Sequence, residues 1–190
     1  MICKYCQGGH PKRAKDSYSI LSTVISDSIS TTSKLIEIIE FEKLFEIVED
    51  GLARVEVDIR AVCCQIVANL AIDYEIPVKI LERILTISGR EKQKVMVEIS
   101  YIFFNLVFYS EKATIVRVLH LGLIPVLGRM AESMHQSILN NISKTVNQIS
   151  QLLDYFDELD RIFVLRQLAE EETLRRILEQ EDIDIEGGYF

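Results

Sequence analysis

The chain has 190 residues, of which 48% are hydrophobic and 26% are charged. This composition indicates a folded chain rather than a disordered one, and the length suffices for one substantial core or a short array of repeats. The formal net charge of −8 and the isoelectric point near 5.0 argue against nucleic acid as a general partner.

Residues 1–15, MICKYCQGGHPKRAK, predict a basic, cysteine-containing tail that precedes the folded part. Cys3, Cys6 and His10 could supply three zinc ligands, but a second Cys or His pair at a suitable spacing is absent. We therefore expect neither a metal nor another cofactor. The tail also lacks an apolar stretch of signal-peptide length, which favours a reducing compartment without disulfides.

Residues 16–178 predict an all-α fold. Apolar residues recur three and four positions apart almost throughout, as in Val95–Leu106 and Ile138–Leu153, and hairpin turn signals are absent. Gly51, Gly89 and Gly122 fall between the periodic segments, where helices commonly end. Cys63 and Cys64 lie inside an apolar helical segment, where free cysteines usually serve as small core residues.

The longest apolar run, Ile99–Ser110, contains twelve consecutive uncharged residues. A helix needs roughly 20 apolar residues to span a bilayer, so we expect no membrane segment. The run contains one amide, Asn105, and polar residues stand in similar places in other long apolar segments.

These polar residues define a repeat. Asn69 precedes Asn105 by 36 positions, Asn147 follows it by 42, and Asp27 precedes Asn69 by 42. A helical period near 40 is typical of armadillo and HEAT arrays. The unit between Asn69 and Asn105 is short. Only the three residues 73–75 precede the next predicted helix, Ile76–Ile87. We therefore expect this unit to lack most of its first helix.

Two segments carry a more specific resemblance. LHLGLIPVLGRM resembles the turn and second helix of an armadillo repeat, and EISYIFFNLVFYS resembles a third helix of importin-α, the nuclear import adaptor. That helix has the pattern E-A-x-W-x-x-x-N, and Glu98, Tyr101 and Asn105 stand at its charged, aromatic and amide positions, with tyrosine in place of tryptophan. The resemblance covers about residues 16–177 and implies an armadillo-type α-solenoid, a right-handed superhelix of about four three-helix repeats.

In importin-α the third helices line a groove that holds an extended basic peptide, the nuclear localisation signal. The resemblance implies that Asn69, Asn105 and Asn147 pair with the peptide backbone through their amides. Tyr101 would pack on a basic side chain, and Glu98 would add charge complementarity. It also implies work in the cytoplasm and nucleus, with import or export karyopherins as further partners.

The chain departs from this pattern at the aromatic positions. It contains no tryptophan, and Gln65, Ser143 and Thr23 stand one helical turn before Asn69, Asn147 and Asp27. A single aromatic slot cannot read several lysines, so the resemblance leaves open a different cargo, a weaker affinity or a lost function.

Both termini have counterparts in the family. Lys12, Arg13 and Lys15 match the form of a nuclear localisation signal, and a basic amino-terminal segment can occupy and inhibit the importin-α groove. A solvated basic tail is the alternative. Residues 179–190 predict a flexible acidic tail, which the family also has. The long importin-β-binding region has no counterpart in residues 1–15.

A second function class remains open. Repeated asparagines can bond to backbone groups between stacked helices without any ligand. The chain would then be a scaffold or assembly subunit without a peptide groove. The array starts within a repeat near Asp16 without a polar cap. Either a partner chain, or a second copy in a homo-oligomer, covers its end, or the repeats are in another register. No phosphate-binding, metalloprotease or nucleophile motif occurs, and we do not expect an enzyme.

Overall fold

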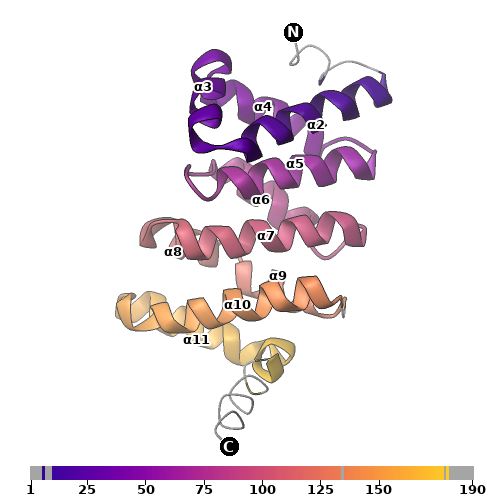
Figure 1. The fold of residues 1–190 in the computed structure, drawn as a ribbon. Coiled ribbons are helices and arrows are strands. Elements are labelled where there is room, and N and C mark those ends of the chain that lie inside the picture. The colour runs from indigo at the N-terminus through magenta and orange to yellow at the C-terminus, as the bar shows by residue number, and fades with distance from the viewer. Residues whose placement is uncertain (1–5, 7–9, 134, 178, 180–190) are drawn as a thin grey trace, which may run out of the picture.

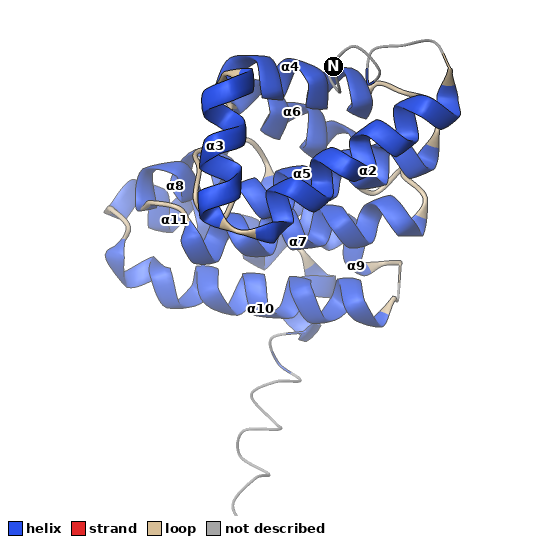
Figure 2. Ribbon diagram, turned by 45° about the horizontal axis from the view of Figure 1, so that its top comes forward, coloured by secondary structure: helices blue, strands red, loops and turns tan. Residues whose placement is uncertain are grey.

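The computed structural model describes residues 6, 10–133, 135–177 and 179, and all regular secondary structure in them is helical (Figures 1 and 2). The prediction of an all-α chain is confirmed for this part. The helices are α2 (Pro11–Asp27), α3 (Ile29–Ile39), α4 (Phe41–Leu52), α5 (Val57–Leu70), α6 (Val78–Ile87), α7 (Gln93–Tyr109), α8 (Lys112–His120), α9 (Leu123–Ala131), α10 (Gln136–Leu152), the 3-10 helix η1 (Leu153–Tyr155) and α11 (Glu158–Glu170). Residues 172–177 are also helical.

The helices α2, α5, α7 and α10 lie side by side in chain order and form one layer, which we call the front layer (Figure 1). Helix α5 packs between α2 and α7, and α7 packs between α5 and α10. Shorter helices, among them α4, α6 and α9, lie behind this layer (Figure 1). Each front helix therefore has one side free of the other helices, and this side is the front face.

The apolar periodicity explains this packing. In α7 the buried apolar residues include Val95, Ile99, Ile102, Phe103 and Leu106, and they cover the sides that contact α5, α10 and the helices behind. Each such side chain contributes roughly 1.5–3 kcal/mol when it leaves water. The core is continuous along the stack rather than confined to one pair of helices.

Two glycines end helices as predicted. Gly122 has φ 97° between α8 and α9, and Gly89 has φ 79° after α6, so both adopt the left-handed conformation that glycine tolerates. The prediction for Gly51 was wrong, because this residue lies buried inside α4. Its missing Cβ admits Tyr18 and Cys63, whose atoms would lie 2.9 and 2.2 Å from that position.

The short unit is confirmed. No helix occurs between the end of α5 and the start of α6 at Val78, whereas α8 separates α7 from α9. The predicted helix Ile76–Ile87 is α6 and begins two positions later, after Pro77, whose φ of −57° and ψ of 138° do not continue a helix backwards.

The boundary of the amino-terminal tail differs from the predicted one. Helix α2 begins at Pro11 and buries Ala14, so residues 11–15 belong to the packed part and not to the amino-terminal tail. Helix α11 ends before Glu171, which has φ −96° and ψ 86°, and the chain turns helical again at residues 172–177. The side chain of Glu171 lies against Gly128 of α9, where any Cβ would collide with it. The predicted acidic tail lies outside the described residues except for Glu179.

Among the described residues no single helix is both long and apolar enough to cross a membrane. The pair α8 and α9 passes the same length and composition test only together, and it is bent by 69°.

Candidate functional site

An aromatic row runs along the front face of α7. Tyr101 and Phe108 are exposed, at 43% and 40%, and Phe104 is half-buried between them. The spacing of three and four residues places all three on one side of the helix. The rings of Phe104 and Phe108 have centroids 4.3 Å apart, so they form a continuous apolar surface. Tyr101 is thus a surface residue rather than another core aromatic.

Asn105 points into the seam between α7 and α5 rather than out to the solvent. It is only 9% exposed, and its Nδ2 donates to the backbone oxygen of Ala68 at 2.7 Å. That oxygen is available because the N–H of Ile72, its partner in a continued helix, bonds to the oxygen of Asn69 at 3.4 Å. Asn105 thus bonds to a backbone group of the neighbouring helix, which is the structural alternative to ligand binding.

The other predicted site residues are distributed over three front helices. Asn69 on α5 and Asn147 on α10 are half-buried, and Asn69 borders a cavity that Asp73 and Tyr74 also line. Glu98 is half-buried on α7, one turn before Tyr101. Burial raises the pKa of Glu98 above its usual value, and the charge of Lys94 opposes this shift.

Further polar bridges, which were not predicted from the sequence, cross the front layer. Asn141 of α10 donates through Nδ2 to Ser100 Oγ of α7 at 2.9 Å, and Ser22 Oγ of α2 donates to Gln65 Oε1 of α5 at 3.0 Å. Asn141 follows Asn105 by 36 positions, the same interval that separates Asn69 from Asn105. The shorter period would therefore have identified it.

The basic residues near the amino terminus lie on the first turns of α2. Lys15 contacts Asp58 of α5 at 2.5 Å, and Asp58 also contacts Lys94 of α7 at 2.6 Å. These two lysines lower the pKa of Asp58 to about 2. Lys12 and Arg13 are exposed on the same helix. Residues 12–15 are helical here, which differs from the extended conformation that occupation of a peptide groove requires.

The described cysteines are buried. Cys63 and Cys64 are free thiols, and burial raises the pKa of both well above the usual range. The prediction of Cys63 and Cys64 as core residues is confirmed. Cys3 lies outside the described residues. In the part of the chain that the structure describes, no group of three His, Cys, Asp or Glu side chains could hold a metal ion. His10, the third candidate ligand, is exposed.

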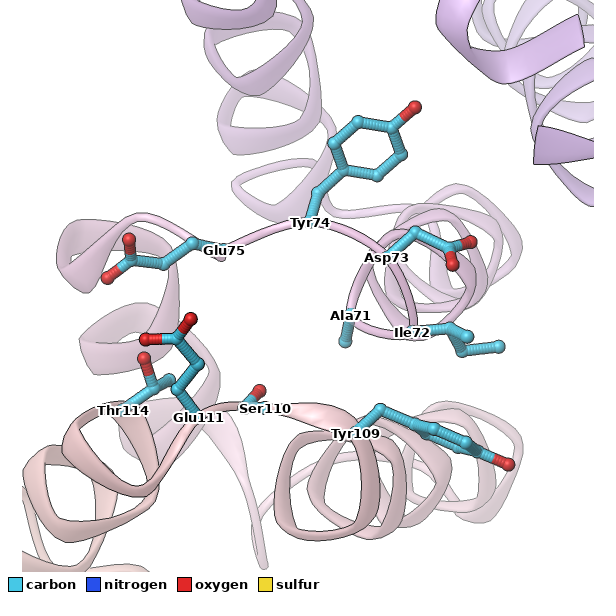
Figure 3. Close-up of a pocket in the computed structure, with 9 residues that line it drawn as sticks. All are labelled: Ala71, Ile72, Asp73, Tyr74, Glu75, Tyr109, Ser110, Glu111 and Thr114. Carbon is cyan, nitrogen blue, oxygen red and sulfur yellow. The ribbon is translucent and has the colours of Figure 1, made fainter. Parts of the chain in front are cut away.

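A pocket of about 300 Å³ opens where α5 and α7 end (Figure 3). Its lining includes three carboxylates, two tyrosines and two hydroxyls: Asp73, Glu75, Glu111, Tyr74, Tyr109, Ser110 and Thr114. In the sequence, residues 73–75 had been expected only to connect two helices. We call this cavity the acidic pocket.

Some of the charged groups around the pocket are paired with each other, and others are not. Glu75 accepts from Arg117 Nη1 of α8 at 3.0 Å, and Tyr74 shares a hydrogen bond of 3.0 Å with Ser33 of α3. Lys112, beside Glu111 in sequence, donates instead to the backbone oxygen of Tyr155 at 2.5 Å. The pocket therefore keeps a negative wall.

No family model matches the sequence. No curated protein matches it either. Among solved structures, the chain is similar to the crystal structure of a protein described only as engineered, with a TM-score of 0.67 and 15% sequence identity. The similarity covers 94% of this chain and 84% of the other. At this identity it concerns the helical fold alone.

Proposed function

We propose that this chain is a non-catalytic adaptor that binds an extended basic peptide across its front face, as armadillo adaptors of the importin-α type do. In this role it would carry proteins with basic localisation signals between cytoplasm and nucleus, together with import or export karyopherins. The helical stack would be a short armadillo-type solenoid with one truncated repeat.

The observation that carries the proposal is the aromatic row of Tyr101, Phe104 and Phe108. A continuous aromatic surface on a front helix costs solubility unless a ligand uses it. Aromatic faces hold the methylene stems of lysine and arginine and attract their charged ends. Tyr101 alone, in the place of the tryptophan of importin-α, would offer little aromatic surface. Together with Phe104 and Phe108 it offers a larger one.

The polar residues around the row have different roles in this proposal. Asn69 and Asn147, on the helices to either side, pair with the backbone of the peptide, and Glu98 meets a basic side chain. Asn105 donates one amide N–H to Ala68 and is only 9% exposed, so little of its amide is accessible to a ligand. Binding therefore depends more on the aromatic row than on Asn105.

Fluorescence anisotropy of a labelled lysine-rich peptide, at low and at physiological salt, tests the proposal. We expect binding that weakens with salt, because the charged contacts are exposed. Tyr101→Ala and Phe108→Ala should each weaken it several-fold. Tyr155→Ala is the matched control, because this tyrosine is also exposed but belongs to η1 and not to α7. A folded wild type that binds no such peptide at low salt would refute the proposal.

A scaffold or assembly subunit is the second candidate, and α11 favours it. Leu159, Ile162 and Leu165 are exposed along this helix, at 81% for Leu159. Apolar residues on a free helix side suit contact with another protein chain. Such an apolar interface changes little with salt. Salt-insensitive self-association or complex formation that Leu159→Lys abolishes, without peptide binding, would favour this candidate over the adaptor.

A further inference from the structure

We propose that one edge of the helical stack is a docking surface for a basic amphipathic helix of another protein. The surface consists of three exposed apolar side chains, Ile29, Ile72 and Tyr109, which we call the edge strip. It lies where the front helices α2, α5 and α7 end, at the left of Figure 1. The proposal goes beyond the adaptor function and does not rest on it.

The edge strip crosses the ends of three neighbouring helices. Ile29 begins α3 directly after the end of α2, Ile72 follows α5, and Tyr109 is the last residue of α7. Ile29 and Ile72 line one cavity of about 140 Å³, and Ile72 and Tyr109 line the next one, the acidic pocket. The side chains of Ile72 and Tyr109 point to the same side of the chain (Figure 3). The three residues therefore form one row with a hollow between each pair.

The exposure of this row indicates contact with a partner. Ile29 is 61% exposed, Tyr109 is 56% exposed and Ile72 is 40% exposed. Single exposed apolar residues are common on soluble proteins, whereas apolar residues gathered on one part of the surface mark interaction sites. The hollows between them leave room for the side chains of the partner.

The charge of the edge selects a basic partner. The last turns of α2, α5, α7 and α10 contain no basic residue, whereas those of α8 and α9 do. The carboxyl end of a helix carries a partial negative charge of about half a unit, which nearby cations stabilise. Asp27 and Asp73 are exposed beside the strip, and Asp73 points to the same side as Ile72 (Figure 3). Lysines and arginines that flank an apolar stripe complement this edge.

The spacing of the row favours a helical partner. Packed helices lie roughly 8–10 Å apart, so residues at the ends of successive front helices recur at about this interval. In an α-helix, positions seven apart lie on nearly the same side and about 10.5 Å apart along the axis. Residues on one side of a β-strand are only about 6.6 Å apart, which does not match. A helix with an apolar residue at every seventh position would contact all three strip residues.

Charge also argues against two other occupants of the edge. A second copy that presents the same edge would bring negatively charged helix ends together. Residues 180–190 of this chain contain acidic residues and no basic one. A basic helix from another protein is therefore the occupant that the observations favour.

Fluorescence anisotropy of a labelled helical probe with the full chain tests the proposal. The probe is an alanine-based peptide of about 21 residues, long enough to form a helix in water, with leucine at every seventh position and lysines on either side of that stripe. One comparison peptide has the same composition but leucines on unrelated sides of the helix, and another has glutamate in place of lysine. We expect saturable binding of the probe at low salt, at least tenfold weaker binding of the first comparison peptide and none of the second.

Two apolar side chains of the strip can be removed without touching the core. Ile72→Ser/Tyr109→Ser should weaken binding of the probe at least tenfold. Val55→Ser/Leu159→Ser is the matched control, because these side chains are even more exposed, at 86% and 81%, and lie before α5 and on α11. This control should leave binding unchanged. Circular dichroism verifies that both variants are folded.

The charge of the edge is tested in the same way. Asp27→Asn/Asp73→Asn should weaken binding of the probe at least threefold at low salt, and the effect should shrink as salt is added. Glu82→Gln/Glu132→Gln removes the same number of charges on α6 and after α9 and should leave binding unchanged.

Three outcomes would overturn the proposal. They are a folded wild type that does not bind the probe at low salt, equal binding of the lysine and glutamate peptides, and equal loss in the strip variant and its control. Sedimentation of the chain alone tests a second copy as the occupant. A dimer that Ile72→Ser/Tyr109→Ser dissociates would also overturn the proposal.

The lysine-rich peptide separates this surface from the adaptor function. Tyr101→Ala should weaken binding of that peptide and leave the helical probe unaffected, and the strip variant should do the opposite. A wild type that binds the probe but no lysine-rich peptide would support the edge surface and refute the adaptor. Loss of both peptides in both variants would show one shared site and overturn the edge surface.

Discussion

Asn105 of α7 donates its side-chain N–H to the backbone oxygen of Ala68 in α5, at 2.7 Å. The bond joins two neighbouring front helices at the carboxyl end of α5, where the oxygen of Ala68 no longer accepts a helical hydrogen bond from Ile72. It also explains why a polar residue interrupts the apolar run Ile99–Ser110: the amide replaces a missing helical hydrogen bond. The same residue type that suggested a ligand therefore stabilises the stack.

We expect Asn105→Ala to destabilise the protein by about 1–3 kcal/mol, because it leaves the oxygen of Ala68 buried without a donor. Denaturant unfolding monitored by circular dichroism measures this change. Asn140→Ala is the matched control, since Asn140 is exposed and accepts a hydrogen bond from Gln136 of its own helix, and should change stability by less than about 0.5 kcal/mol. Equal stability of the two variants would show that the bond to Ala68 contributes nothing.

Asp58 should make stability depend on pH in the acid range. Its pKa is about 2 in the folded chain, below its usual value of 3.8, because Lys15 and Lys94 both contact it. A depressed folded pKa adds stability above the unfolded pKa, and this is lost as the pH falls from about 4 towards 2.

We therefore expect Asp58→Asn to melt at a lower temperature than wild type at neutral pH and low salt. The difference should shrink with added salt, because the three groups are partly exposed. It should disappear near pH 2. Thermal unfolding from pH 2 to pH 7 measures it. A difference that stays constant with pH would assign the effect of the substitution to something other than the charge.

The helical class and the truncated unit could be predicted because both depend on local patterns. Apolar spacing defines the helices, and the seven residues 71–77 cannot hold a helix with its caps. The roles of the asparagines could not be predicted. Whether Asn105 faces solvent or a neighbouring helix depends on how α5 ends, and the sequence of α7 does not contain that information.

The acidic pocket was missed for a similar reason. Asp73 and Glu111 are 38 positions apart in sequence, and only the parallel arrangement of the ends of α5 and α7 brings them to one cavity. Gly51 shows the opposite error. Glycine commonly follows a helix, but here it lies inside one, because two distant side chains need the space.

Gly51→Ala should destabilise the chain by about 1–3 kcal/mol through overpacking. The new methyl would meet Cys63 Sγ at 2.2 Å and the ring of Tyr18 at 2.9 Å. Gly122→Ala is the comparison, because no atom lies within 4 Å there and only the left-handed conformation costs energy, about 1 kcal/mol. Adding Cys63→Ala should rescue part of the loss in Gly51→Ala and none in Gly122→Ala. Chemical denaturation of the four variants measures this, and simple additivity would contradict a clash at Cys63.

The ion pair between Arg60 of α5 and Glu91, just before α7, is the most buried of those described. The two atoms lie 2.7 Å apart, and the side chains are only 14% and 13% exposed. Arg60 also donates to the backbone oxygen of Arg54 at 2.6 Å, so its guanidinium cannot turn to solvent without losing a second bond. Glu91→Ala leaves this cation enclosed and should cost about 3 kcal/mol.

Glu170→Ala is the control for this pair, because Glu170 contacts Arg166 on the exposed side of α11. Its loss should cost less than about 1 kcal/mol. Arg60→Met/Glu91→Leu, which replaces both charges by apolar side chains of similar size, should recover much of the stability lost in Glu91→Ala. Equilibrium unfolding in urea gives all three values. If the double variant is as unstable as Glu91→Ala, the loss comes from packing at this seam and not from an unpaired buried charge.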